Sequence, residues 1–194
     1  MRSKRTTLGL IGPLRSQKNG SRPLSAGEIA LARLIFGDSI DYSSVKIHRR
    51  GYLWLGLQHA DVAMAPNGEI YFGRKCFKND FSRENASSRH WFIHEMTHVW
   101  QHQLGYPVKW RGAIRIGLNY RYILEPNRKL GSFKMEAQGD LLADYFALRF
   151  LREPRVMARP EYRDDIALYE QVLRDFLENP ASKANLPRRR VFAV

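Results

Sequence analysis

A stripe of apolar residues at helical spacing runs through residues 85–104, and the same segment carries two histidines and a glutamate. The apolar positions recur three or four residues apart, as in a helix that buries one face: Phe92, Ile93, Met96, Val99, Trp100 and Leu104. Gly105 follows, where a helix commonly ends. Ionisable side chains inside such a helix are costly to bury unless they have partners. The ionisable side chains of the segment His94-Glu95-Met96-Thr97-His98 should therefore share a binding partner.

The spacing of this HExxH segment suits a metal ion. Residues i and i+4 of an α-helix lie about 40° apart around the axis and about 6 Å apart along it, so two imidazoles can reach one ion. Neutral imidazole suits tetrahedral Zn²⁺. Glu95 lies beside the first ligand, where it would take a proton from the metal-bound water. We predict one zinc ion, with His94 and His98 as ligands and Glu95 as the catalytic base; the alternative is a pair of core histidines satisfied by hydrogen bonds.

A third protein ligand is expected on a second helical segment, at about residues 133–152. Glu136 and Asp140 are four residues apart and share a helix face. Glu136 is the preferred ligand, and Asp140 would accept the second ring N–H of a ligand histidine. Asp140 and Asp144 have the same spacing, so either is an alternative ligand. Gly139 would let the two helices approach closely.

Hydrolysis at such a site also needs a hydrogen-bond donor for the tetrahedral intermediate. His102 continues the series of His94 and His98, but it lies about 12 Å along the helix axis from His94 and is too distant to share the ion. His102 would instead lie behind a ligand, face the substrate or lie at the surface, and it is one of the candidate donors. Spacing does not rank the candidates, which are Tyr120, Arg121, Tyr122, Tyr145 and His102.

The remaining patterns predict an α+β fold, with a small antiparallel sheet or hairpin packed on the HExxH helix and on the Glu-bearing helix. Ser25 and Glu28 have the spacing of a capping box, and Gly37 ends that helix. The turn Pro66-Asn67-Gly68 between two short apolar segments is typical of a hairpin. The expected elements are helices at 25–37, 85–104, 133–152 and 161–178 and strands at 45–48, 61–65 and 69–73.

The formal charge of +13 is concentrated at the two ends of the 194-residue chain. Residues 1–27 hold six basic residues and residues 179–194 hold four, and neither range holds an acid; the rest is nearly balanced. Basic ends without apolar patterning are usually solvated tails. We expect a basic tail at 1–23, one domain at 24–180 and a second basic tail at 181–194. This distribution argues against nucleic acid as the partner.

Several classes of protein are excluded by what the chain lacks. Cys76 is the single cysteine, which excludes an internal disulfide framework and a CxxC motif. No apolar run approaches the roughly 18 residues that span a membrane. The short apolar stretch at 8–14 is interrupted by two glycines and a proline, unlike a signal peptide. We expect synthesis in the bacterial cytoplasm.

Two resemblances to known proteins are carried by these segments. The first is to the VgrG-related zinc metallopeptidases associated with bacterial type VI secretion; it spans about residues 24–152 and rests on LSAGEIALARLIFGDSIDYSSVKIHRR, VAMAPNGEIYF, FIHEMTHVWQHQLG and EAQGDLLADYFALR. The second is to the gluzincin arrangement of thermolysin-like metallopeptidases, in which HExxH precedes a Glu-x-x-x-Asp helix. In this chain the stretch from His98 to Glu136 is longer, and Met135 stands where those enzymes often have Asn.

The resemblance implies a zinc metallopeptidase with a zincin-like fold that hydrolyses amide bonds. It implies His94, His98 and Glu136 as zinc ligands, Glu95 as the base, and, by analogy, a strand at 69–73 that pairs with extended substrate. It also implies an antibacterial type VI effector, or toxin, that acts in the periplasm of a target cell on a polypeptide or on the peptide part of peptidoglycan. A VgrG spike and a cognate immunity protein would be its partners.

Two other functions stay open at this point. A catalytically degenerate zincin would serve as an adaptor on the secretion spike. A nucleic-acid-binding module would use the basic ends, and its affinity would fall steeply with salt.

Overall fold

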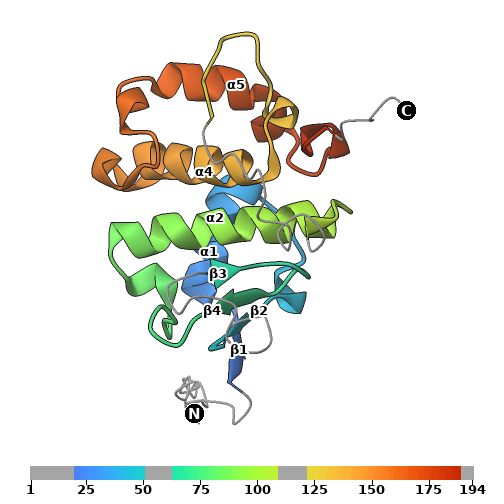
Figure 1. Ribbon diagram of the computed structural model, residues 1–194, viewed down its shortest axis with the longest axis vertical. Coiled ribbons are helices and arrows are strands. Elements are labelled where there is room, and N and C mark those ends of the chain that lie inside the picture. The colour runs from blue at the N-terminus through green and yellow to red at the C-terminus, as the bar shows by residue number, and fades with distance from the viewer. Residues whose placement is uncertain (1–19, 51–62, 109–121, 189–194) are drawn as a thin grey trace, which may run out of the picture.

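The computed structural model describes residues 20–50, 63–108 and 122–188. Within these ranges a small sheet lies on one side of the central helix α2, and helices α4 and α5 follow on its other side (Figure 1). The strands are β1 (Ser21–Pro23), β2 (Lys46–His48), β3 (Ala63–Met64) and β4 (Ile70–Phe72). The helices are α1 (Ala26–Phe36), α2 (Ala86–Gln103), α4 (Met135–Phe146) and α5 (Ile166–Glu178). The α+β class is therefore as expected.

The helices begin and end where local signals place them. Ser25 Oγ accepts from the backbone N–H of Glu28 over 3.1 Å, and Glu28 Oε2 accepts from the N–H of Ser25 over 2.8 Å, which is the predicted capping box. Gly37, with φ of +53°, ends α1. Asn85 caps α2 by accepting from the N–H of Ser88 over 2.9 Å. The expected helices at 25–37 and 85–104 are confirmed.

Two helices differ from their expected ranges. The expected helix at 133–152 is α4 followed by a π-helical turn at Ala147–Leu151. The expected helix at 161–178 begins later, at Ile166, because a 3₁₀ turn at Pro160–Tyr162 precedes it. Proline suits the first position of such a turn but donates no hydrogen bond to a helix. The other 3₁₀ turns in the described ranges are Tyr42–Ser44, Phe81–Arg83, Leu130–Ser132, Pro154–Val156 and Lys183–Asn185.

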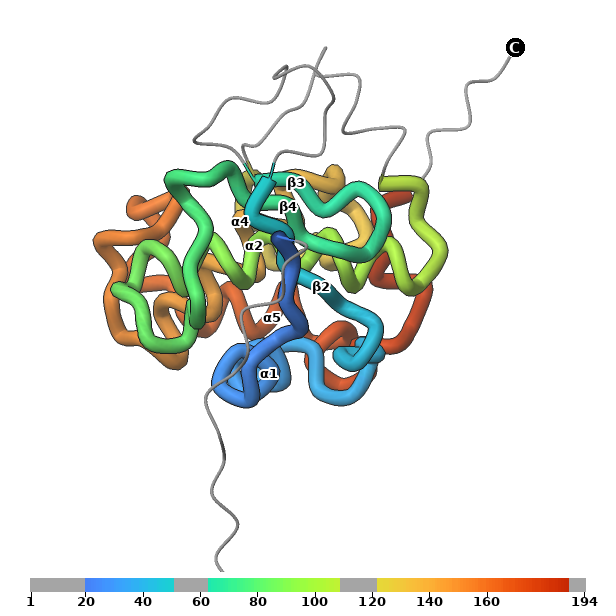
Figure 2. Tube along the Cα trace, turned by 90° about the horizontal axis from the view of Figure 1, so that it is seen from below, coloured from blue at the N-terminus to red at the C-terminus, as the bar shows by residue number. Residues whose placement is uncertain are grey.

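The sheet is mixed, which corrects the expectation of an antiparallel sheet. The order is β1-β2-β4-β3; β1 and β3 are antiparallel to their neighbours, but β2 and β4 are parallel. The predicted hairpin is confirmed, since β3 and β4 pair around a turn in which Gly68 has φ of +81°. Parallel pairing joins segments distant in sequence, so local patterns did not indicate it. Figure 2, a view from below, shows these strands in front of α2 and α4.

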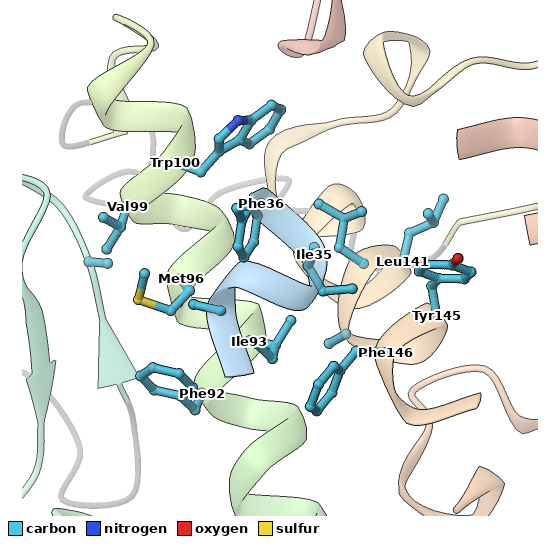
Figure 3. Close-up of a cluster of buried hydrophobic side chains, with 14 of the residues drawn as sticks. Ile35, Phe36, Phe92, Ile93, Met96, Val99, Trp100, Leu141, Tyr145 and Phe146 are labelled. Carbon is cyan, nitrogen blue, oxygen red and sulfur yellow. The ribbon is translucent and has the colours of Figure 1, made fainter. Parts of the chain in front are cut away.

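The apolar stripe of α2 faces the core, as its spacing predicted. Phe92 and Met96 lie toward the sheet, whereas Ile93 lies toward α1 and α4 (Figure 3). Ile35 and Phe36 of α1 lie between α2 and α4 in the same view. The ring of Phe81 links sheet and helix through stacked contacts with Phe72, at 4.4 Å between centroids, and Phe92, at 5.6 Å. These contacts hold α2 in place between the sheet and α4.

The described residues include the inner part of each expected tail, and both parts are folded against the domain. At the amino end, β1 pairs with β2, and Arg22 binds the buried carboxylate of Glu28 through two hydrogen bonds of 2.7 Å. At the carboxyl end, the side chain of Asn185 is buried, and the N–H of Arg188 bonds to the carbonyl of Gly131 over 3.1 Å. Basic composition misled here, because the partly buried guanidinium of Arg22 pairs with the fully buried carboxylate of Glu28. No helix in the described part of the chain is long and apolar enough to cross a membrane.

Candidate metal centre

Helices α2 and α4 lie side by side and carry the predicted metal ligands (Figure 1). A glycine of α4 permits this approach. A Cβ atom built on Gly139 would lie 2.7 Å from Cε1 of His94 and 2.9 Å from its Nδ1. These distances are too short for any side chain, so the imidazole of His94 occupies the space that a larger residue would need. The close approach expected from Gly139 is present.

Three donor atoms converge from the two helices. Nε2 of His94 and Nε2 of His98 are 3.2 Å apart, and Oε2 of Glu136 lies 3.2 Å from His98 and 3.4 Å from His94. Ligand atoms about 2.0–2.1 Å from a tetrahedral zinc ion lie about 3.3 Å from one another. The three atoms meet this distance, and two imidazoles with a carboxylate match the zinc donor set of His₂Glu sites. These residues therefore fit the predicted ion.

The second ring nitrogens of the two histidines have separate partners. Nδ1 of His94 lies 2.9 Å from Oδ1 of Asp140, and Nδ1 of His98 lies 2.9 Å from Oε1 of Gln101. With Nδ1 donating, Nε2 of each neutral ring presents a lone pair. Two lone pairs and a carboxylate oxygen at these distances repel one another unless a proton or a cation lies among them. The geometry favours a positive charge at this point.

The pKa directions report the same preference. Burial disfavours the charged imidazolium of His94, but hydrogen bonds to Asp140 and Glu136 outweigh burial and raise its pKa well above the usual range. Burial also opposes charge on His98, and Glu136 raises its pKa. Burial would raise the pKa of Glu136, but the two histidines lower it far below the usual value. The site therefore favours positive charge, and protons would compete with any metal ion for it.

Glu95 lies beside the three donor atoms but is not among them. The residue is 3% exposed, and its Oε1 accepts from the indole N–H of Trp91 over 3.2 Å. Oε2 is buried and makes no hydrogen bond within the described part of the chain. Burial raises the pKa of Glu95, and the charge of the two histidines acts in the opposite direction. A buried carboxylate with one free oxygen can accept a proton from a bound water.

Asp144, an alternative third ligand, has other partners. It is fully buried and accepts from His90 Nε2 over 2.7 Å, from the Tyr122 hydroxyl over 2.5 Å, and from the backbone N–H groups of Ala158 and Arg159 over 2.7 and 2.9 Å. Asp140, the other alternative, contacts Nδ1 of His94, on the opposite side of the ring from the convergent Nε2. Glu136 is the acidic residue that joins the two histidines.

Three of the candidate donors for the tetrahedral intermediate, Tyr122, Tyr145 and His102, lie within the described residues. The hydroxyl of Tyr122 is buried against Asp144 and Tyr169, so it is not free to bind a substrate. The ring of Tyr145 packs on the rings of Tyr169 and Phe150. The expectation for Tyr122 is corrected, because its hydroxyl is already bonded to Asp144 and Tyr169. The role of Tyr145 stays a prediction. The remaining candidates are His102, which is exposed beside Gly68, and Tyr120 and Arg121, which lie outside the described residues.

The strand expected to pair with substrate is also corrected. β4 lies inside the sheet, with β2 on one side and β3 on the other, so its backbone groups are already paired. A segment can add only to a strand with a free edge. Within the described sheet, the strands with free edges are β1 and β3.

Sequence patterns missed three polar residues that support the site. Trp91 contacts Glu95, Gln101 contacts His98, and Gln138 contacts Gln101. Gln101 lies three residues after His98 and Gln138 lies two residues after Glu136. Polar residues inside an otherwise apolar helix face were the available signal, because buried amides need partners.

Comparison with known proteins agrees with the similarity seen in the sequence. No protein-family profile matches the chain. It is 47% identical over 133 residues to the type VI secretion system spike protein VgrG2b of Pseudomonas aeruginosa. The matched region covers 64% of this chain and 13% of VgrG2b. It also matches the solved effector domain of Pseudomonas aeruginosa VgrG2b, with 42% identity, a TM-score of 0.62, and coverage of 79% of this chain and 86% of that domain. The chain belongs to the VgrG2b effector-domain family.

Membership of the VgrG2b effector-domain family confirms the predicted relationship to VgrG-related proteins of type VI secretion. The match is limited to a small part of VgrG2b, since the chain spans 13% of the length of that spike protein. The similarity to the VgrG2b effector domain, in contrast, extends over most of both chains. The relationship is thus one of a domain and concerns the folded unit that carries the three donor atoms.

Proposed function

We propose that this protein is a zinc-dependent peptidase-like hydrolase with a zincin-like fold and that it serves as a type VI secretion effector. One observation carries the proposal: three donor atoms of His94, His98 and Glu136 lie 3.2–3.4 Å apart, beside a buried glutamate with a free oxygen. Two histidines four residues apart with an intervening glutamate on a helix are the arrangement used in metal-assisted peptide hydrolysis. The donor set supports one zinc ion.

The residues divide the chemistry among them. Zinc, when bound, supplies positive charge that polarises a substrate carbonyl and acidifies a water molecule. Oε2 of Glu95 would accept the proton of that water and pass it to the leaving amine. Burial raises the pKa of Glu95, which makes its carboxylate a stronger base than an exposed one and so favours uptake of the proton. Asp140 and Gln101 hold the protons of the second ring nitrogens, so that both Nε2 atoms keep their lone pairs.

The names of the relatives support a proposal for the biological role. VgrG2b is named as a spike protein of a type VI secretion system, and its matching domain is named as an effector domain. We propose that the present protein is likewise carried by a VgrG spike, acts in the periplasm of a target bacterium, and is countered by an immunity protein in the producing cell. Its substrate would be a polypeptide or the peptide part of peptidoglycan.

The decisive experiment combines metal analysis with one conservative variant. The purified full chain should contain one zinc ion by mass spectrometry and should cleave members of a fluorogenic peptide library or purified peptidoglycan fragments. Glu95→Gln should retain zinc and lose about 10²–10⁴-fold in kcat, as expected for removal of a general base. The wild type exported to a bacterial periplasm should slow growth, and Glu95→Gln should not. Wild-type protein without zinc, or a fully active Glu95→Gln variant, would refute the proposal.

Two binding measurements, on a VgrG spike and on nucleic acid, separate the two alternatives. A degenerate adaptor would bind zinc and a VgrG spike but would hydrolyse neither class of substrate. A nucleic-acid-binding module would bind DNA or RNA with an affinity that falls steeply between 50 and 200 mM salt, by about 10³–10⁵-fold for six to ten phosphate contacts. The position of Arg22 disfavours this second alternative, because its guanidinium is already committed to Glu28.

A further inference from the structure

A chain of buried amides extends behind His98, away from the three convergent donor atoms. Gln101 and Gln138 are both fully buried, one on α2 and the other on α4. Nδ1 of His98 lies 2.9 Å from Oε1 of Gln101, and Nε2 of Gln101 donates to Oε1 of Gln138 over 2.9 Å. The chain therefore crosses from one ligand-bearing helix to the other.

The hydrogen bonds fix which way each amide faces. Nε2 of Gln138 donates to the backbone carbonyls of Leu130, over 2.8 Å, and Asn185, over 2.9 Å. Carbonyl oxygens only accept, so the amino group of Gln138 must face them and Oε1 must face Gln101. Nε2 of Gln101 then donates to Oε1 of Gln138 and to the carbonyl of Met135, over 3.1 Å. A flipped amide at either position would set like groups against one another.

This orientation decides the tautomer of His98. Both N–H groups of Gln101 are used, so the group it presents to His98 is an acceptor oxygen. An acceptor at that place requires a proton on Nδ1 of His98. In the neutral ring, Nε2 then carries the lone pair, and it faces Nε2 of His94 and Oε2 of Glu136.

We propose that Gln101 and Gln138 are positioning residues for His98 and that the carboxyl-terminal segment is part of this support. The proposal rests on the proposed function only in taking His98 as a metal ligand. The amide chain ends at the backbone carbonyl of Asn185, in the 3₁₀ turn Lys183–Asn185. The side-chain amide of Asn185 in turn donates to the carbonyl of Asn179 over 3.0 Å. Trp100 of α2 donates to the carbonyl of Pro180 over 2.9 Å in the same segment. Residues 179–185 thus brace both ligand-bearing helices.

The two histidines are supported in different ways. His94 has a carboxylate partner, Asp140, whose side chain is 15% exposed and near the surface. His98 has a neutral amide partner in the interior, which orients the ring without burying another negative charge next to Glu95 and Glu136. A charged partner at that depth would need a further cation. A neutral amide partner therefore suits the buried imidazole of His98.

The test is zinc affinity rather than activity. Gln101→Leu and Gln138→Leu in the full chain should each weaken zinc binding about 10–100-fold in competition with a chromophoric chelator, the usual effect of losing an outer partner. Gln103→Leu is the matched control on the same helix, because its amide bonds to Asp41 and Ser44 at the surface. Gln103→Leu should bind zinc as the wild type does. Near-ultraviolet circular dichroism reports whether each variant is folded.

The effect of Gln138→Leu is the informative one, since Gln138 does not touch the ligand. A folded Gln138→Leu protein with wild-type zinc affinity would overturn the proposal. A second measurement needs no variant: ¹⁵N NMR of the zinc-loaded wild type should show His98 with its proton on Nδ1, in slow exchange with solvent, and the opposite tautomer would equally overturn the proposal. Failure of the proposed function would appear differently, as zinc-loaded wild-type protein that hydrolyses nothing.

Discussion

Nε1 of Trp91 lies 3.2 Å from Oε1 of Glu95, one helical turn further along α2. The indole therefore holds one oxygen of the proposed base and leaves Oε2 free. The ring itself is fixed by an edge contact with Phe72, at 5.2 Å between centroids. A hydrogen bond to a charged group contributes about 1.5–3 kcal/mol, so its loss should be measurable in the rate.

We expect Trp91→Phe to lower kcat about 10-fold, since about 1.4 kcal/mol corresponds to a tenfold change. KM and zinc content should stay unchanged, because the indole touches neither ligand nor ion. Steady-state kinetics on a cleaved fluorogenic peptide give both constants. Gln103→Leu is the control on the same helix: its amide bonds to Asp41 and Ser44 at the surface, so kcat should be retained. Equal kcat for Trp91→Phe and wild type would show that the contact does not position Glu95.

Gly139→Ala should separate helix stability from metal binding. Alanine is favoured over glycine within a helix by about 1 kcal/mol, but its Cβ would lie 2.7 Å from Cε1 of His94. The imidazole can rotate away at low cost to the fold, yet Nε2 then leaves the position from which it meets Glu136. We expect weaker zinc binding, by at least about tenfold, with unchanged or raised thermal stability of the metal-free protein. Unaltered zinc affinity would contradict this account of Gly139.

Asp144→Asn should destabilise the protein without removing the metal. Asp144 receives four hydrogen bonds, and an amide in its place would set an N–H group against a donor. Each buried donor left unpaired costs about 1–3 kcal/mol. Urea unfolding of the metal-free protein measures this loss. Zinc stoichiometry should stay at one in Asp144→Asn and fall to zero in Glu136→Ala; the reverse pattern would make Asp144 the ligand.

Zinc binding should release protons and strengthen as pH rises. Asp140 and Glu136 raise the pKa of His94, and Glu136 raises that of His98, so the metal-free site holds protons near neutral pH that zinc must displace. A raised folded-state pKa stabilises the metal-free protein below the unfolded value, and this contribution is lost as pH rises through the folded value. Titration calorimetry in buffers of different ionisation enthalpy counts the released protons. Heats that do not depend on the buffer would contradict the prediction.

Local sequence signals predicted the helical part of this site. The capping box at Ser25 and the helix spacing of His94, His98, Glu136 and Asp140 depend only on neighbours within one turn. Spacing alone left Glu136, Asp140 and Asp144 as alternatives, because all three share a face of α4. Tertiary contacts distinguish the three carboxylates: Asp144 accepts from the Tyr122 hydroxyl, and Asp140 contacts Nδ1 of His94 rather than Nε2.

The sheet and the two ends show where local signals stop. The parallel pairing of β2 with β4 joins strands separated by a long connection, and it places β4 inside the sheet. Composition places Arg22 and Asn185 in solvated tails, because it does not reveal their buried partners. Arg22 bonds to Glu28, 6 residues away, and the carbonyl of Asn185 accepts from Gln138, 47 residues away. The role of Gln138 was equally hidden in the sequence, since it depends on the carbonyl of Asn185 near the carboxyl end of the described chain.

The separation of His98 and Glu136 along the chain has a consequence for folding. These residues are 38 positions apart, and their side-chain atoms meet at 3.2 Å across two helices. An ion bound to both would act as a cross-link, and closing a loop of that length removes on the order of 4 kcal/mol of chain entropy from the unfolded state. The proposed catalytic metal would thus also stabilise the fold. Removal of the ion would lower the free energy of unfolding as well as abolish hydrolysis.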